Sequence, residues 1–201
     1  RLLARVGAMA LVSDRADDPA APVPTIRPGA LPERGDPAAE RRPGGERPAQ
    51  IVLSSGTSGP SKASPASHRQ LARRLREPSA LLGMGPDSRY RPLIAMAFVL
   101  GRYPALRTLD AGGSVVLRPL PRTMPEVLAE LNSDRVTYLQ LTPNHVTQML
   151  AALPADPATG PALPHMRAFV VTSAVVSMAM RRATVERLTP APPGQKYLWA
   201  S

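Results

Sequence analysis

The sequence predicts an α/β fold with a layered, largely parallel sheet and flanking helices. From residue 51 onward, short apolar runs alternate with stretches in which apolar residues recur at helical spacing. This alternation favours parallel strands, because each crossover between parallel strands needs a connection about as long as a helix. The expected strands are residues 51–53, 93–98, 114–117, 136–139, 166–171 and 196–199.

Each of three expected helices begins with a hydroxyl residue that can cap the free N–H groups of its first turn. These caps are Thr123, Thr142 and Ser177. Glu126 completes a capping box with Thr123, and Pro143 takes the first helical position after Thr142. The third helix is expected to run to residue 188.

Residues 1–49 show no such periodicity. A short apolar run at residues 8–12 could form a strand, and Pro, Arg, Asp and Gly are abundant from about residue 13 onward, as is typical of a connector. We therefore divide the chain into a partial strand with a Pro/Arg-rich connector at residues 1–49 and an α/β domain at residues 50–201.

The composition limits the classes of function. A formal net charge of +10 invites a nucleic-acid partner, but the cations are scattered, and aromatic residues, on which bases stack, make up only 3%. We therefore expect no nucleic-acid binding. No apolar stretch of about 18 residues predicts a membrane span. The absence of cysteine excludes disulfides and fits a reducing cytoplasm.

The strongest functional signal is the loop at residues 55–62, Ser-Gly-Thr-Ser-Gly-Pro-Ser-Lys, directly after an expected strand. Glycines let backbone N–H groups turn toward an anion, hydroxyls add donors, and Lys62 adds a positive charge. This composition predicts phosphate binding. We expect the loop to lie beyond the carboxyl end of a strand of the parallel sheet, together with the segments after residues 98, 171 and 199.

Plainer interpretations stay open at this point. The same loop composition suits a Ser/Gly/Pro surface linker. The histidines, His68, His145 and His165, lack metal-ligand spacing, and His145 fits a surface or packing role better. A Ser–His–Asp arrangement stays possible, although the sequence has no Gly-x-Ser-x-Gly elbow.

The loop resembles the phosphate-loop signature of the adenylate-forming acyl-activating enzymes, Ser-Gly-Thr-Thr/Ser-Gly-x-Pro-Lys-Gly. Ser61 stands in place of the proline and Ala63 in place of the last glycine. The resemblance implies that the matching residues bind the phosphates of ATP. These residues are Ser55, Gly56, Thr57, Ser58, Gly59 and Lys62.

Later segments resemble further blocks of this family in the same order. Phe98 and Gly101 lie in a block similar to the Phe-His-Ala-Leu-Gly motif at the acyl pocket. Thr172, Ser173 and Ala174 resemble the loop along the adenine and acyl pocket, with Thr172 in place of a glycine.

The last residues resemble the start of the aromatic-Gly-x-Thr-Glu motif. In the better register Trp199 matches the aromatic residue that stacks on adenine, and in a second register Tyr197 takes that place. The glutamate associated with Mg²⁺ would follow Ser201. We therefore expect no complete turnover from residues 1–201 alone.

The resemblance implies part of the N-terminal domain of an ATP-dependent acid–thiol ligase similar to acyl-CoA synthetases, with the C-terminal domain absent. Such an enzyme converts a fatty or aryl acid to an acyl-adenylate and passes the acyl group to the thiol of CoA or of a carrier protein. An α-amino acid is disfavoured, because residues 97–102 contain no acid to pair with an ammonium group.

Two other hypotheses remain. A homologue without catalytic activity could have kept the fold as a nucleotide-binding or scaffold protein, and the residues at Ser61, Ala63 and Thr172 leave room for this. An unrelated α/β domain with a Ser/Gly loop is the other.

Overall fold

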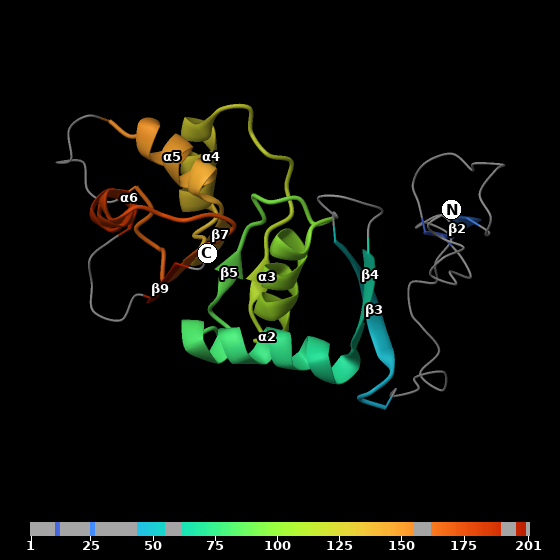
Figure 1. The fold of residues 1–201 in the computed structure, drawn as a ribbon. Helices are drawn as coiled ribbons and strands as arrows, with labels where there is room; N and C mark the ends of the chain where they lie inside the picture. Colours follow the sequence, from blue (N-terminus) through green and yellow to red (C-terminus); the bar gives the residue numbers. More distant parts are fainter. Residues whose placement is uncertain are drawn as a thin grey trace. The chain divides into compact units, whose positions relative to one another are not determined.

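The computed structural model describes residues 11–12, 25–26, 44–54, 62–154, 162–189 and 196–199. The chain divides into two compact units, Arg1–Leu71 and Ala72–Ser201, which we describe separately. The first unit contains two small two-stranded sheets, and the second contains a five-stranded sheet with its helices (Figure 1).

All five strands of the larger sheet are parallel, in the order β6-β5-β7-β8-β9. Their bounds are β5 Arg89–Tyr90, β6 Ser114–Val115, β7 Tyr138–Leu141, β8 Ala168–Val171 and β9 Lys196–Trp199. The predicted α/β class is confirmed. Leu141 pairs with Val171, and Val171 pairs with Trp199, so the carboxyl ends of β7, β8 and β9 lie level at one edge.

One expected strand is wrong. Residues 93–98 do not form a strand, and the strand at this place is the short β5, followed by Arg91 and Pro92. Pro92 has no N–H group to donate to a strand ladder, so the strand does not continue into the apolar run. The other expected strands of this sheet overlap observed ones, at residues 114–117, 136–139, 166–171 and 196–199.

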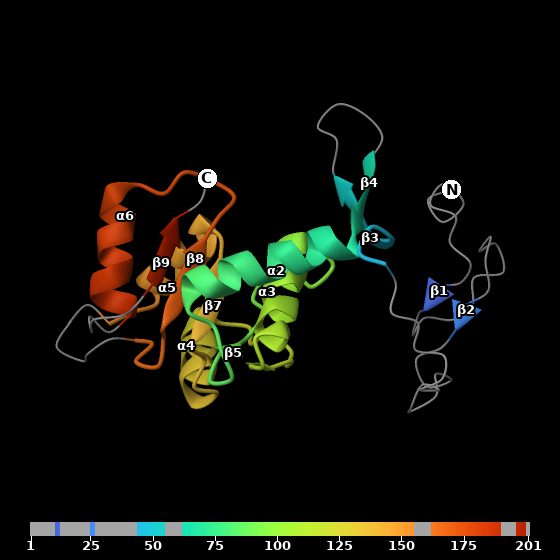
Figure 2. The same ribbon diagram turned by 90° about the horizontal axis from the view of Figure 1, so that it is seen from below.

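Helices cover both faces of this sheet (Figures 1 and 2). Their bounds are α2 His68–Leu82, α3 Val99–Asp110, α4 Met124–Ser133, α5 Pro143–Ala151, α6 Met178–Ala183 and the π-helical turn η4 Thr184–Leu188. Successive strand residues point to opposite faces. Tyr138 belongs to a core cluster with Leu82 of α2 and Ala105 of α3. Leu139 and Phe169 belong to a second cluster with residues of α4, α5 and η4.

The predicted helix caps are confirmed. Glu126 Oε2 accepts a hydrogen bond from the Thr123 N–H at 3.1 Å, within a capping box. Thr142 forms a similar box, with His145 Nδ1 as the acceptor at 3.3 Å. Ser177 Oγ accepts an N–H from the first turn of α6 at 3.2 Å. The third helix continues through η4 and ends at its predicted residue.

The first unit differs from the prediction. Residues 51–53 lie in β3, Pro48–Ser54, which pairs antiparallel with β4, Lys62–Ser67, and is not a strand of the parallel sheet. The segment Lys62–Ser67 has no apolar alternation, so its strand state depends on pairing with β3. A further pair, β1 Leu11–Val12 and β2 Thr25–Ile26, includes part of the strand expected at residues 8–12.

The helix that follows the hairpin begins with a capping box. Ser67 Oγ accepts from the Gln70 N–H at 3.3 Å, and the Ser67 N–H donates to Gln70 Oε1 at 3.0 Å. Two free N–H groups are thereby satisfied at the start of α2. The strand β4 separates Lys62, the last residue of the predicted phosphate loop, from α2.

Two glycines make the turn between α3 and β6. Gly112 has a φ of +82°, in the left-handed region that favours glycine. A Cβ on Gly113 would lie 2.4 Å from the carbonyl oxygen of Ser88. The pair therefore allows β6 to enter the sheet close to the backbone before β5.

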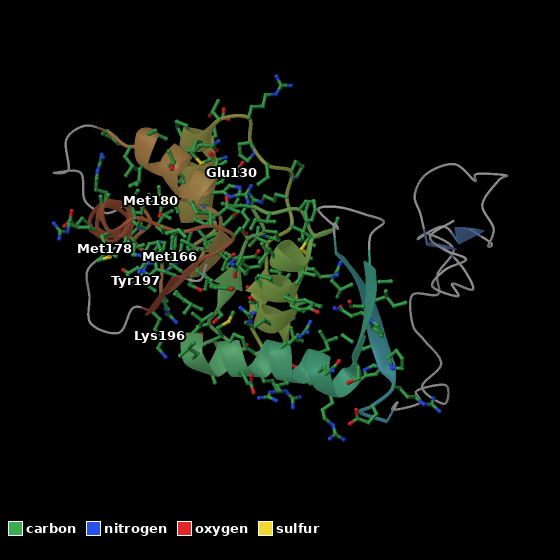
Figure 3. The ribbon with its side chains drawn as sticks, viewed as in Figure 1. Glu130, Met166, Met178, Met180, Lys196 and Tyr197 are labelled. Atoms are coloured by element: carbon green, nitrogen blue, oxygen red, sulfur yellow. The ribbon has the colours of Figure 1, made fainter. Side chains whose placement is uncertain are left out.

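Arg91, only 1% exposed, ties the carboxyl end of β5 to α4. Its Nη1 donates to Asp134 Oδ2 at 3.2 Å, and its Nη2 donates to the carbonyl oxygen of Pro119 at 3.3 Å. It also pairs with Glu130, which is labelled on α4 in Figure 3. Arg118 also contacts Asp134, at 3.0 Å. A buried guanidinium needs such partners, because an unpaired charge is costly to desolvate. The cluster fixes the segment after β6 against α4.

Candidate functional site

The carboxyl edge of the five-stranded sheet carries the predicted segment after residue 171 and ends at Trp199, whereas the predicted segment after residue 98 is the helix α3 and does not directly follow a strand. The loop that leads to Phe98 follows β5, Thr172 follows β8, and Trp199 ends β9. Ligands of open parallel sheets bind beyond this edge. The fourth segment, the loop after β3, belongs to the antiparallel hairpin of the first unit, so the prediction that it follows a strand of the same sheet is wrong.

Phe98 and Gly101 lie at the start of α3. Phe98 is the N-cap residue, with extended backbone, and is 65% exposed. Gly101 is buried in the first turn, and a Cβ there would lie 2.4 Å from the carbonyl oxygens of Ile94 and Ala95. Tyr90 Oη donates to the Gly101 carbonyl oxygen at 3.5 Å. A glycine is therefore needed for α3 to begin against the loop after β5.

The loop after β8 is bound at its start by β7. Gln140 Nε2 donates to Thr172 Oγ1 at 3.0 Å, and the Thr172 N–H donates to the carbonyl oxygen of Leu141 at 3.0 Å. Ser173 has a φ of +85°, whereas Thr172, which stands in place of a glycine, has no positive φ. The left-handed residue of this turn is therefore a serine. Ser173 and Ala174 are both exposed.

Trp199 is half-buried at the end of β9. Its ring lies 6.4 Å from the ring of Phe169, centroid to centroid. The guanidinium carbon of Arg181, on α6, lies 5.6 Å from the centroid of the Trp199 ring, within cation–π range. Arg181 Nε also donates to the carbonyl oxygen of Val176 at 3.2 Å. One side chain thus connects Trp199 to the loop after β8.

A chain of buried polar side chains leads from α3 toward the same loop. Arg107 Nη1 donates to Tyr138 Oη at 3.0 Å, and Tyr138 Oη donates to Gln140 Oε1 at 3.3 Å. Burial raises the pKa of Tyr138 to about 12, so its hydroxyl remains protonated and can donate. This chain orients the Gln140 amide and, through it, Thr172.

Sequence reasoning missed Gln140, Arg107 and Arg181. All three are polar residues that make their contacts across elements distant in the sequence. Gln140 and Arg107 are also buried, at 4% and 9% exposure. A polar residue inside an apolar strand, as at Gln140, was the signal that could have identified one of them, because buried polar groups need partners.

The predicted phosphate-binding residues lie mostly outside the described part of the chain. These are Ser55, Gly56, Thr57, Ser58 and Gly59. The backbone of Lys62 is described as the first residue of β4, where it pairs with Ser54 of β3. Lys62 therefore stands where the hairpin loop returns to its second strand, and the role of the loop stays a prediction.

Two apolar hollows border the segments that follow β5 and β6. One, of about 500 Å³, is lined by residues 92–96 and 116–120. The other, of about 580 Å³, includes Leu93 and His145. Neither is lined by a predicted site residue. His145, predicted as a surface or packing residue, is half-buried in its capping box, and burial lowers its pKa.

No helix among the described residues has both the length and the apolar character needed to cross a membrane. Within the same ranges, no three His, Cys, Asp or Glu side chains are grouped so that they could hold a metal ion.

A model of the AMP-binding enzyme family matches residues 3–197, and the chain therefore belongs to this family. The family predicted from the phosphate loop and the later blocks is confirmed. A search of curated proteins found no match.

Solved structures of adenylate-forming enzymes share the fold. The nonribosomal peptide synthetase FmoA3 is 22% identical, with a TM-score of 0.77 over 100% of this chain and 21% of that chain. The N-terminal subdomain of NpsA from Klebsiella oxytoca, in complex with 3-hydroxybenzoyl-AMSN, is 19% identical, with a TM-score of 0.74 over 100% and 49%.

A malonyl-CoA ligase with methylmalonyl-CoA and AMP bound is 26% identical, with a TM-score of 0.70 over 90% of this chain and 40% of that chain. FmoA3 is also known in an AMPPNP-bound form, 22% identical to this chain, with a TM-score of 0.75. The chain thus spans between about a fifth and a half of the length of these structures.

Proposed function

We propose that the full-length protein uses ATP to activate a carboxylic acid. The carboxylate oxygen attacks the α-phosphorus of ATP, the bond to the leaving pyrophosphate breaks, and an acyl-adenylate forms. A thiol, of CoA or of a carrier protein, then attacks the acyl carbon and releases AMP. The observation that carries this proposal is the phosphate-loop signature at residues 55–62 in a chain that belongs to the AMP-binding family.

The phosphate loop supplies charge and donors. Backbone N–H groups at Gly56 and Gly59, the hydroxyls of Thr57 and Ser58, and the Lys62 ammonium bind the β- and γ-phosphates. Nucleotidyl transfer depends more on positioning and charge neutralisation than on covalent help from the protein. Lys62 therefore lowers the cost of separating pyrophosphate from the α-phosphorus.

The sheet edge supplies the nucleotide and acyl pocket. Trp199 stacks on adenine, and Thr172, Ser173 and Ala174 line the groove between adenine and acyl group. Three features support this assignment: the exposed tip of the loop after β8, the fixed position of Thr172, and the half-buried ring of Trp199. Phe98 and Gly101 form the wall of the acyl pocket at the start of α3.

The acid is an acyl or aryl acid rather than an α-amino acid. A buried ammonium requires a carboxylate partner, and residues 97–102 contain none. The charged residue of this stretch is Arg102, whose Nη1 donates to the carbonyl oxygens of Met96 and Ala97 at 3.4 Å. A cation at this wall disfavours a second cation in the pocket and is compatible with an acid that has no ammonium group.

The test is ATP–pyrophosphate exchange by the full-length protein across a panel of fatty, aryl, dicarboxylic and amino acids. We expect exchange that depends on a fatty or aryl acid. Faster exchange with an amino acid would contradict the substrate class. Nucleotide binding with no exchange for any acid would instead favour the second candidate, a nucleotide-binding homologue without catalytic activity, which the residues at Ser61, Ala63 and Thr172 support.

A further inference from the structure

We propose that Arg181 is a positioning residue of the proposed nucleotide site, which joins the loop after β8 to the Trp199 ring and so fixes the position of one relative to the other. The inference rests on the proposed function, because it deepens the role of the same site. We call the contacts of Arg181 with Val176 and Trp199 the Arg181 bridge.

The first contact fixes the buried end of the loop after β8. Arg181 Nε donates to the carbonyl oxygen of Val176 at 3.2 Å. Val176 is only 4% exposed, whereas Val175 beside it is 82% exposed. At the other end, Gln140 binds Thr172. The loop is therefore held by a side chain at both ends, and residues 173–175 between them are exposed to solvent.

The second contact reaches a strand that is adjacent to this loop in space but distant in sequence. The guanidinium lies 5.6 Å from the centroid of the Trp199 ring, which also packs against Phe169. Figure 3 marks the two elements that are bridged, with Met178 and Met180 on α6 and Lys196 and Tyr197 on β9. Because Val171 pairs with Trp199, the loop after β8 leaves the sheet beside this ring.

An arginine suits both contacts at once. Its Nε–H donates within the plane of the guanidinium, while the face of the same plane can lie over an aromatic ring. Lysine can place a charge near the ring but has no planar group to combine the two contacts. We therefore expect Arg181→Lys to keep only part of the interaction with Val176 and Trp199 that Arg181→Met loses.

The expected kinetic effect is on nucleotide binding. Adenine is distant from the α-phosphorus at which bonds form and break, so contacts that shape its pocket are equally strong in the ground state and in the transition state. Loss of such uniform binding raises KM and leaves kcat unchanged. A merely structural role would instead lower kcat and the melting temperature together, with KM for ATP unchanged.

The test compares three variants of the full-length protein: Arg181→Met, Arg181→Lys and the matched control Arg182→Met, which removes an exposed cation from the next residue of α6. We expect Arg181→Met to raise KM for ATP about three- to tenfold, with kcat within about twofold. The ratio of kcat/KM for ATP to kcat/KM for GTP should fall in the same variant, because the contacts that distinguish the two bases are weakened. The KM for ATP of Arg181→Lys should lie between those of the wild type and Arg181→Met. The KM for ATP of Arg182→Met should equal that of the wild type.

Hydrogen exchange tests the bridge without any turnover. Amides in residues 172–177 and 196–199 should exchange faster in Arg181→Met than in the wild type or in Arg182→Met. Unchanged exchange in both segments, or an unchanged KM for ATP in an active enzyme, overturns the inference. If the wild type activates no acid, the proposed function fails, and hydrogen exchange alone then decides whether Arg181 holds the two segments together.

Discussion

The first unit, called here the hairpin unit, and the second, called the sheet unit, differ in how their predicted site residues can be recognised. In the hairpin unit the signal lies in the order of residues, since residues 55–62 match a phosphate-loop pattern almost position by position. In the sheet unit the sequence motifs are short and substituted, but long-range contacts connect the residues, as between Gln140 and Thr172. An anion-binding loop built from local backbone can be recognised in a sequence, whereas a pocket built from several strand ends needs its tertiary contacts.

The largest expected effect is on the stability of the sheet unit. Arg91→Met leaves Asp134 buried without its buried partner, and we expect the free energy of unfolding to fall by about 3–5 kcal/mol. Denaturant unfolding measures this change. Arg118→Met is the matched control, because it removes the other partner of Asp134 from a side chain that is 52% exposed, and it should cost less than about 1 kcal/mol. Equal losses for the two variants would show that burial does not decide the strength of this cluster.

The next effect is on catalysis, from the hairpin unit. Lys62→Ala removes a charge-assisted contact worth about 1.5–3 kcal/mol, so kcat/KM for ATP should fall roughly ten- to a hundredfold while the melting temperature stays unchanged. Lys62→Arg should restore activity only in part. Lys196→Ala, at the only other lysine of the sequence, is the control. If Lys62→Ala matches the wild type at ATP well below saturation, the loop is a surface linker.

A smaller effect on stability is expected at the start of α3. The Cβ introduced by Gly101→Ala would meet two backbone carbonyl oxygens at 2.4 Å, so the loop after β5 must shift. We expect a loss of about 1–3 kcal/mol in the free energy of unfolding. Gly85→Ala is the control, since a Cβ there meets nothing within 4 Å. If Gly101→Ala leaves the free energy of unfolding unchanged, the loop after β5 adapts to the added Cβ and its position does not depend on α3.

The smallest expected effect is a pH dependence at His145. Burial lowers its pKa in the folded protein, so below the ordinary value of 6.5 the unfolded chain binds the proton more readily. The free energy of unfolding therefore falls as the pH is lowered from 7 toward 5. His145→Gln keeps a residue that can complete the capping box but cannot titrate. The free energy of unfolding should therefore depend less steeply on pH in this variant. An identical slope would contradict the assignment of this pH dependence to His145.

Local signals in the sequence were sufficient for part of the fold. Thr123, Thr142 and Ser177 were correctly placed as helix caps, because a cap depends on residues within one turn of each other. The parallel α/β class followed from the alternation of apolar patterns, and the family followed from the phosphate loop. Each of these inferences rests on neighbours in the sequence.

Only the tertiary structure decided the pairing of strands and the contacts at the sheet edge. Residues 51–53 looked like a strand of the parallel sheet, but a strand pattern does not specify which strand it pairs with. The strand that contains them pairs with β4. Residues 93–98 looked like a strand, whereas the observed strand β5 ends before Pro92. The Arg181 contact with Trp199 is set by the packing of α6 against β9, because no local pattern specifies which distant ring a cation will meet.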